Sequence, residues 1–166
     1  MLQLDGAALE MSGKKFKYDV PKPFGPKGKA AFFEIVARPA SSLNTDFQQK
    51  VDELMHQSRV ADRKVEKAYE ADKDDDAFLR GREENMKWVQ KALAEMQYDA
   101  CIMEWKSNIQ NAGKDIEATR ENYVMLAGFP HADIRELFLK IDADIQKAAN
   151  FSIIAEEEVM EAEAKN

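Results

Sequence analysis

Four acidic residues in the middle of the chain have the spacing of a calcium-binding loop. Asp72, Asp74 and Asp76 match positions 1, 3 and 5 of an EF-hand loop, and Glu83 matches position 12. Such a loop also needs a sharp turn at its sixth position, where glycine is usual. The chain has Ala77 there. We therefore expect an acidic helix start, which the exposed amides of a helix N-terminus stabilise, and no calcium site.

Glu53 and His56 form half of the carboxylate–histidine motif that binds two iron ions in helical bundles. A complete site needs a second Glu-x-x-His and two further glutamates on facing helices. The only other histidine is His131, and Gly128 stands three residues before it. One chain cannot complete this site, so we predict no metal or other cofactor and expect His56 at the surface.

Cys101 is the only cysteine, so the sequence can form neither an internal disulfide nor a CxxC site. A nucleophilic thiol needs a neighbouring base or the positive start of a helix to lower its pKa. Cys101 instead adjoins Ala100, Ile102 and Met103, so we expect a small core residue. The sequence also has no serine elbow, glycine-rich phosphate loop or HExxH motif. We therefore predict no catalytic residues and no enzymatic activity.

Residues 1–40 predict an N-terminal leader and a β-hairpin. We expect residues 1–13 to be weakly ordered. From Lys14 to Val20 apolar and charged residues alternate, and a β-branched and aromatic run ends at Pro39, which are strand patterns. The intervening prolines and glycines predict a loop. A lone hairpin is only marginally stable, so this one must pack on the rest of the chain.

Residues 41–107 predict a long helical hairpin. Thr45 is the expected N-cap of its first helix, or Ser42 if that helix begins earlier. Apolar residues recur at alternating spacings of three and four, which is a helical stripe. In the first helix they are Phe47, Val51, Leu54, Ser58, Ala61, Val65 and Ala68, and in the second Met86, Val89, Leu93, Met96, Ala100 and Met103. We expect the second helix to continue to Trp105 and to pack antiparallel on the first.

Residues 108–166 predict a C-terminal helical subdomain. Gly113 suits a turn with positive φ, and Thr119 suits the N-cap of a short helix that ends at Gly128. The final helix has its apolar stripe at Ile134, Phe138, Ile141, Ile145, Ala148 and Ser152, and we expect its acidic end, from Glu156, to fray. The predicted fold is mainly α, with a small N-terminal β-hairpin, a long αα-hairpin and a C-terminal helical pair.

Aromatic and methionine side chains gather around the predicted short helix. Methionine is flexible and adapts to varied apolar partners. The candidate contacts are Trp105, Met125, Phe129, Phe138 and Phe151. These residues could form a groove for a partner helix, with core packing as the alternative. For Met86, Met96 and Met103 we expect core packing, because apolar stripes usually face inward.

The net charge of −7 argues against polyanionic partners. Proteins that bind phosphates cluster their lysines and arginines, whereas here basic residues are interleaved with acids, except in the short run from Lys14 to Lys17. No stretch approaches the roughly 20 apolar residues that cross a bilayer. The first residues, Met1 to Asp5, also lack the basic region of a signal peptide. We expect a cytoplasmic protein that binds neither nucleic acid nor a membrane.

The C-terminal part has a distinctive order of features. A helix end at Glu104–Trp105 precedes a Gly113–Lys114 turn and a capped helix start at Thr119–Asn122. A last helix with Ala149-Asn150-Phe151 then leads to an acidic run and Lys165–Asn166. From about Tyr98 to Asn166 the chain resembles the tail assembly chaperones of long-tailed bacteriophages. The run Phe33–Arg38, followed by a charged helix, also looks like the start of such proteins. Residues 59–88 depart from the family and indicate a helical insertion, or a different phage protein that shares an end domain.

This resemblance implies a non-enzymatic protein made in the cytoplasm of an infected bacterium. Such chaperones bind the long, helix-rich tape measure protein and keep it soluble. They help to recruit tail tube protein subunits around it and are absent from the mature virion. The alternative is a structural virion component or another helical interaction module, which a stable homo-oligomer in purified particles would identify.

Overall fold

A computed structural model describes residues 13–20, 24–27 and 29–151 of the 166-residue chain. The predicted leader, apart from Gly13, and the predicted fraying end from Glu156 lie outside the described residues, as do Pro21, Pro23 and Gly28 of the predicted loop. The predicted fold class is confirmed: the chain is mainly helical, with a small antiparallel sheet, a long αα-hairpin and C-terminal helices.

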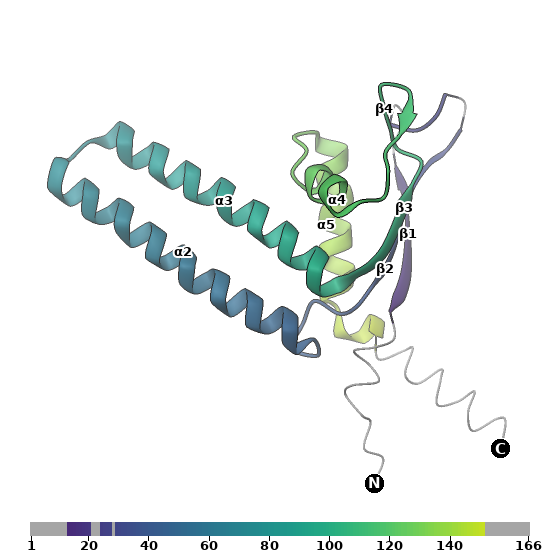
Figure 1. Cartoon of the computed structure of the whole chain (residues 1–166), viewed down its shortest axis with the longest axis horizontal. Helices are drawn as coiled ribbons and strands as arrows, with labels where there is room; N and C mark the ends of the chain where they lie inside the picture. Colours follow the sequence, from purple (N-terminus) through teal and green to yellow (C-terminus); the bar gives the residue numbers. More distant parts are fainter. Residues whose placement is uncertain (1–12, 21–23, 28, 152–166) are drawn as a thin grey trace, which may run out of the picture.

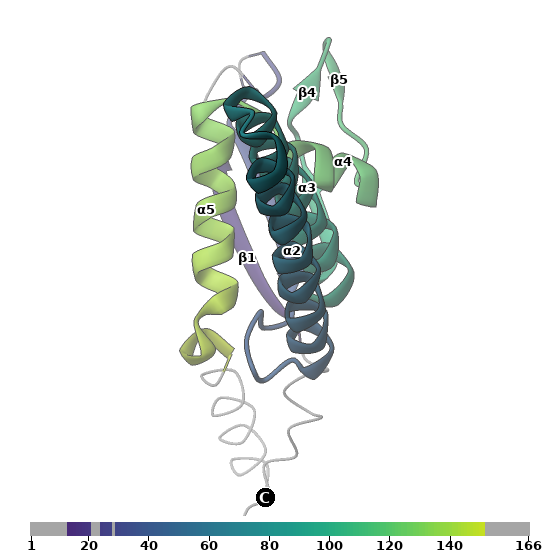
Figure 2. The same ribbon diagram turned by 90° about the vertical axis from the view of Figure 1, so that its left-hand side faces the viewer.

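The long hairpin projects away from the part that contains the sheet and the C-terminal helices (Figure 1). Figure 2 looks onto the tip of this hairpin, with α5 beside it and β1 behind. The elements are β1 (Lys14–Val20), β2 (Ala31–Ala37), α2 (Thr45–Asp72), α3 (Asp75–Cys101), β3 (Ile102–Ser107), β4 (Gln110–Asn111), β5 (Lys114–Asp115), α4 (Arg120–Ala127) and α5 (Ala132–Gln146).

The predicted β1–β2 hairpin is confirmed, and a third strand joins it. The sheet has the order β1-β2-β3 with antiparallel pairing throughout. Phe16 and Tyr18 are half-buried and Val20 is buried, whereas Lys17 and Asp19 between them are exposed. The alternation in the sequence therefore marks the two faces of the sheet correctly.

The prediction that the second long helix continues to Trp105 is wrong. Helix α3 ends at Cys101, and Ile102–Ser107 form β3. The pairing shifts between Val36 and Ala37: Val36 pairs with Glu104 and Ala37 with Ile102, so Met103 is the extra residue of a β-bulge. Because of this bulge Ile102 and Trp105 are both buried although they are three residues apart. Two buried residues at a spacing of three are typical of one face of an α-helix, so the sequence predicts a helix here.

Helix α2 has Asn44 as its N-cap, so the predicted caps Thr45 and Ser42 are wrong by one and two residues. The Asn44 side chain accepts a hydrogen bond from the Phe47 amide at 3.1 Å, as an N-cap should. Its Nδ2 donates to the Ala100 carbonyl oxygen at 2.9 Å. Asn44 therefore connects the start of α2 to the end of α3 at the base of the hairpin.

The predicted antiparallel pairing of the two long helices is confirmed. Gly81 allows close approach, because a Cβ atom at this position would lie 3.0 Å from Cγ2 of Val65. Near the tip, the rings of Tyr69 and Phe78 lie 5.0 Å apart. The expected acidic helix start is also confirmed, since the Asp74 side chain caps α3 by accepting a hydrogen bond from the Ala77 amide at 3.1 Å.

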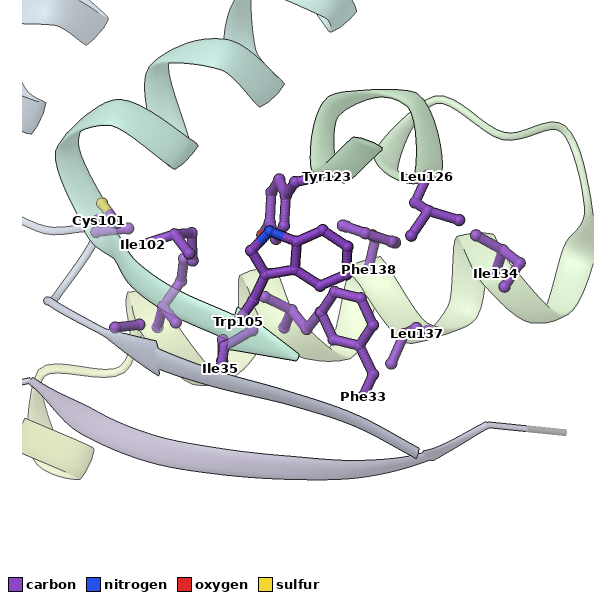
Figure 3. Close-up of a cluster of buried hydrophobic side chains, with 14 of the residues drawn as sticks. Phe33, Ile35, Cys101, Ile102, Trp105, Tyr123, Leu126, Ile134, Leu137 and Phe138 are labelled. Carbon is purple, nitrogen blue, oxygen red and sulfur yellow. The ribbon is translucent and has the colours of Figure 1, made fainter. Parts of the chain in front are cut away.

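The hydrophobic core lies between the sheet and helices α4 and α5, around the base of the hairpin, and includes residues from all three predicted segments. Figure 3 shows Phe33 and Trp105 directed from the strands toward Tyr123 and Phe138. The Phe33 ring lies 5.3 Å from Trp105 and 5.6 Å from Phe138. Cys101 is 1% exposed, and burial raises the pKa of its thiol to about 12. Its predicted role as a core residue is confirmed.

The short C-terminal helix α4 begins and ends where the sequence predicts. Thr119 caps α4 by accepting a hydrogen bond from the Asn122 amide at 3.2 Å, and Gly128 ends this helix. Gly113 has the predicted positive φ of 78°, in the tight turn between β4 and β5. Along α5, the predicted apolar stripe faces the core through Ile134, Phe138, Ile141 and Ile145. The prediction is wrong for Ala148, which is exposed and follows the end of α5 at Gln146, and Ser152 lies outside the described residues.

Candidate protein-interaction site

Three of the five predicted contact residues lie in the core. Trp105 is buried, and its Nε1 donates a hydrogen bond to the Thr119 carbonyl oxygen at 3.2 Å. Phe138 packs against Tyr123, and Phe151 packs against Phe16. Their burial agrees with the core alternative.

Met125 and Phe129 are the two predicted contact residues that are exposed. They are four residues apart, at the C-terminal end of α4 and just beyond it. Phe129 begins the connection to α5, where its amide donates to the Leu126 carbonyl oxygen at 3.0 Å. This pair remains a predicted contact site.

The expectation that Met86, Met96 and Met103 share the core is correct only for Met96. Met86 and Met103 are exposed. Helix α2 contacts α3 through Gly81, opposite Val65, and through Asn85, whose Nδ2 donates to Asp62 at 3.3 Å. Met86 follows Asn85 by one residue, which is about 100° around the helix, and so faces away from α2. Met103 is the extra residue of the bulge in β3.

The hairpin carries most of the exposed large apolar side chains in the described part of the chain. There are ten such residues, and six belong to α2 or α3: Met55, Val60, Leu79, Met86, Trp88 and Leu93. Two helices paired without a third can bury only the stripes that face each other. The sequence supplies additional apolar residues beyond these stripes, and they stay in contact with solvent.

An open groove runs along one side of the hairpin. Its volume is about 440 Å³, and it is lined by His56, Gln57, Val60, Ala61, Lys64, Asn85 and Trp88. Trp88 is 42% exposed, and His56 is exposed as predicted. Exposed tryptophans beside apolar and polar residues are typical anchors of protein–protein contacts. We call this the Trp88 groove.

A second apolar surface lies on another side of α3. Trp88 and Met86 are two residues apart, so their side chains point about 200° apart around the helix. Leu79, Met86 and Leu93 recur every seven residues and therefore share one side. We call these three residues the α3 stripe. The hairpin thus presents two separate apolar surfaces, neither of which is covered in the described part of the chain.

Gln97, near the base of α3, connects the hairpin to both C-terminal helices. Its Nε2 donates to Oδ1 of Asp142 on α5 at 2.5 Å, and its Oε1 accepts from the Tyr123 hydroxyl of α4 at 3.2 Å. Burial raises the pKa of the Asp142 carboxyl above its ordinary value, and the hydrogen bond from Gln97 only partly offsets this. The ionised Asp142 carboxylate therefore destabilises the folded state.

Replacing Asp142 with asparagine should stabilise the protein at neutral pH and have less effect in acid. The side-chain amide of the variant can still accept the hydrogen bond from Gln97 but carries no buried charge. Because the folded state holds the Asp142 proton to a higher pH than the unfolded state, this residue makes stability fall as pH rises above the ordinary carboxyl pKa. Thermal melts of both proteins between about pH 4 and 8 would measure this. An Asp142→Asn protein destabilised equally at every pH would contradict the prediction.

The described residues contain no group of three or more His, Cys, Asp or Glu side chains placed to hold a metal ion. Among those same residues, no helix combines the length and apolar character required to span a bilayer. No protein family, curated protein or solved structure matches the chain. The site is therefore defined by its own geometry: a projecting helical hairpin with two exposed apolar surfaces.

Proposed function

We propose that the protein is a non-enzymatic binding protein whose helical hairpin holds another polypeptide, and that it serves as a phage tail assembly chaperone. The observation that carries this proposal is the set of six exposed large apolar residues on α2 and α3. Exposed apolar side chains on a projecting element are typical of protein interaction sites.

The Trp88 groove suits a helical partner. A groove between two helices can accept the apolar face of a third, which then completes a three-helix layer. Val60, Ala61 and Trp88 supply apolar contact, while Lys64 and His56 at the same groove can pair with polar or acidic groups of the partner. The tape measure protein, long and rich in helices, is a partner of this kind.

The resemblance to tail assembly chaperones supports this choice of partner. It covers mainly the C-terminal segment from about Tyr98, whereas residues 59–88 depart from it. Those residues form the distal part of the hairpin, including its tip. In this proposal they extend the binding surface of the chaperone. The net charge of −7 helps to keep a complex with an apolar partner in solution. The protein then acts in the host cytoplasm and leaves before the virion matures.

Co-expression with a phage tape measure protein tests the proposal. The chain should keep the tape measure protein soluble and co-purify with it. Trp88→Ala should weaken this binding at least about tenfold, since anchor residues of this type commonly contribute about 2 kcal/mol or more. Leu139→Ala is the matched control, because Leu139 is exposed on α5 and lies outside the hairpin.

Two outcomes would contradict the chaperone proposal. In the first, the tape measure protein stays insoluble in the presence of the chain. In the second, the chain is a stoichiometric component of purified particles, which would identify it as a structural virion protein.

A further inference from the structure

We propose that the α3 stripe is a self-association surface, which pairs with the α3 stripe of a second copy of the chain in an antiparallel arrangement. Leu79, Met86 and Leu93 are 64%, 58% and 40% exposed, a high degree of exposure for apolar residues on a well-formed helix. Seven residues make almost two helical turns, so the three side chains form one line along α3. A line of this period is the pattern with which one helix packs against another.

The order of residues in the stripe indicates the partner. Leucine, methionine and leucine at equal spacing read the same in both directions along the helix. A two-fold axis through Met86 therefore places Met86 against Met86 of the second copy and each Leu79 against the second copy's Leu93. Dimers with two-fold symmetry require this self-complementarity, because the same surface must serve on both subunits.

The charges beside the stripe are compatible with this arrangement. Arg82 and Glu83 follow Leu79 by three and four residues and so flank the stripe on its two sides, and Val89 and Gln90 follow Met86 in the same way. In an antiparallel two-fold pair each side of the stripe meets the same side of the second copy's stripe, so Arg82 lies nearest Val89 of the second copy, and Glu83 nearest Gln90. At these positions no two like charges face each other.

The size of the stripe predicts a reversible dimer. From Leu79 to Leu93 the helix extends about 21 Å. A contact of two helices over this length is at the small end of specific interfaces, so association should depend on protein concentration. The stripe is separate from the Trp88 groove, and this inference does not depend on the proposed function.

Sedimentation velocity over a wide range of protein concentration tests the dimer. The unmodified chain should pass from monomer to dimer, and Met86→Glu should weaken dimerisation at least about tenfold by placing two carboxylates together on the axis. Trp88→Ala is the control that should leave the dimer unchanged. Circular dichroism would establish that both variants keep their helix content. A chain that is monomeric at every concentration would overturn the inference, as would a dimer that Met86→Glu leaves intact.

Disulfide cross-linking tests the antiparallel register directly, because native Cys101 is buried. Under mild oxidation two Met86→Cys chains should form a disulfide with each other. Leu79→Cys should link to Leu93→Cys when the two variants are mixed, and neither should link efficiently alone. Efficient linking of Leu79→Cys to itself would indicate a parallel pair and overturn the proposed register.

Discussion

Replacement of Trp105 with alanine should lower the free energy of unfolding by about 3–5 kcal/mol, the range for removal of a large buried aromatic side chain. Trp105 is only 4% exposed, and its ring stacks on Phe33 with a centroid distance of 5.3 Å. The substitution would leave a cavity between the sheet and α4. It would also remove the Nε1 hydrogen bond to the Thr119 carbonyl oxygen. Denaturant unfolding followed by circular dichroism would measure the change.

Met125→Ala and Phe129→Ala are the controls for this experiment. Both residues are exposed, so each substitution should change stability by no more than about 0.5 kcal/mol. Comparing the three variants shows which of these predicted contact residues stabilise the core and which do not. If Trp105→Ala kept its stability and lost only partner binding, Trp105 would be a contact residue that contributes little to the free energy of unfolding.

The elements with strong local patterns could be predicted from the sequence. The alternation between Lys14 and Val20 predicts β1, because a strand with one buried face needs that period. Thr119 and Gly128 mark the ends of α4 through cap chemistry that depends only on neighbouring residues. Such features are local, so they are visible without knowledge of the fold.

The orientation of α3 could not be predicted, because the helix carries two apolar stripes. One includes Val89 and Met96, and the other is the α3 stripe, with Met86 and Leu93. The choice between them depends on where α2 can approach closely, which Gly81 and Val65 decide across the hairpin. Strand β3 could not be predicted for a related reason, since its bulge gives Ile102 and Trp105 a helical spacing.

The candidate site was only partly predictable. The sequence marks the region around Met125 and Phe129 by its density of large apolar residues, but that density also describes a core. Trp88 lies beside the apolar stripe of its helix, and this offset position is the one signal that could have indicated the groove. Whether such a residue is covered depends on the absence of a third helix in the described part of the chain, which is a property of the tertiary structure.

Asn44 shows how one side chain can determine both the start of a helix and its docking. Its amide group accepts a hydrogen bond from the Phe47 amide and donates one to the Ala100 carbonyl oxygen. Asn44 is only 5% exposed, so water cannot readily replace its hydrogen bonds to the Phe47 amide and the Ala100 carbonyl oxygen if the side chain is removed. The sequence places Asn44 next to the predicted cap at Thr45, but the contact with Ala100 joins positions 56 residues apart.

Asn44→Ala should therefore lower the free energy of unfolding by about 2–3 kcal/mol. Loss of an N-cap costs about 1 kcal/mol, and a buried carbonyl without its donor costs about 1–3 kcal/mol. Asn44→Ser should recover roughly 1 kcal/mol of this loss, because its hydroxyl can cap α2 although it cannot replace both bonds of the amide. Ser42→Ala, at the other predicted cap, is the control and should change stability by less than about 0.5 kcal/mol. Equal unfolding midpoints for Asn44→Ala and Ser42→Ala in urea would show that the Asn44 contacts do not hold the base of the hairpin.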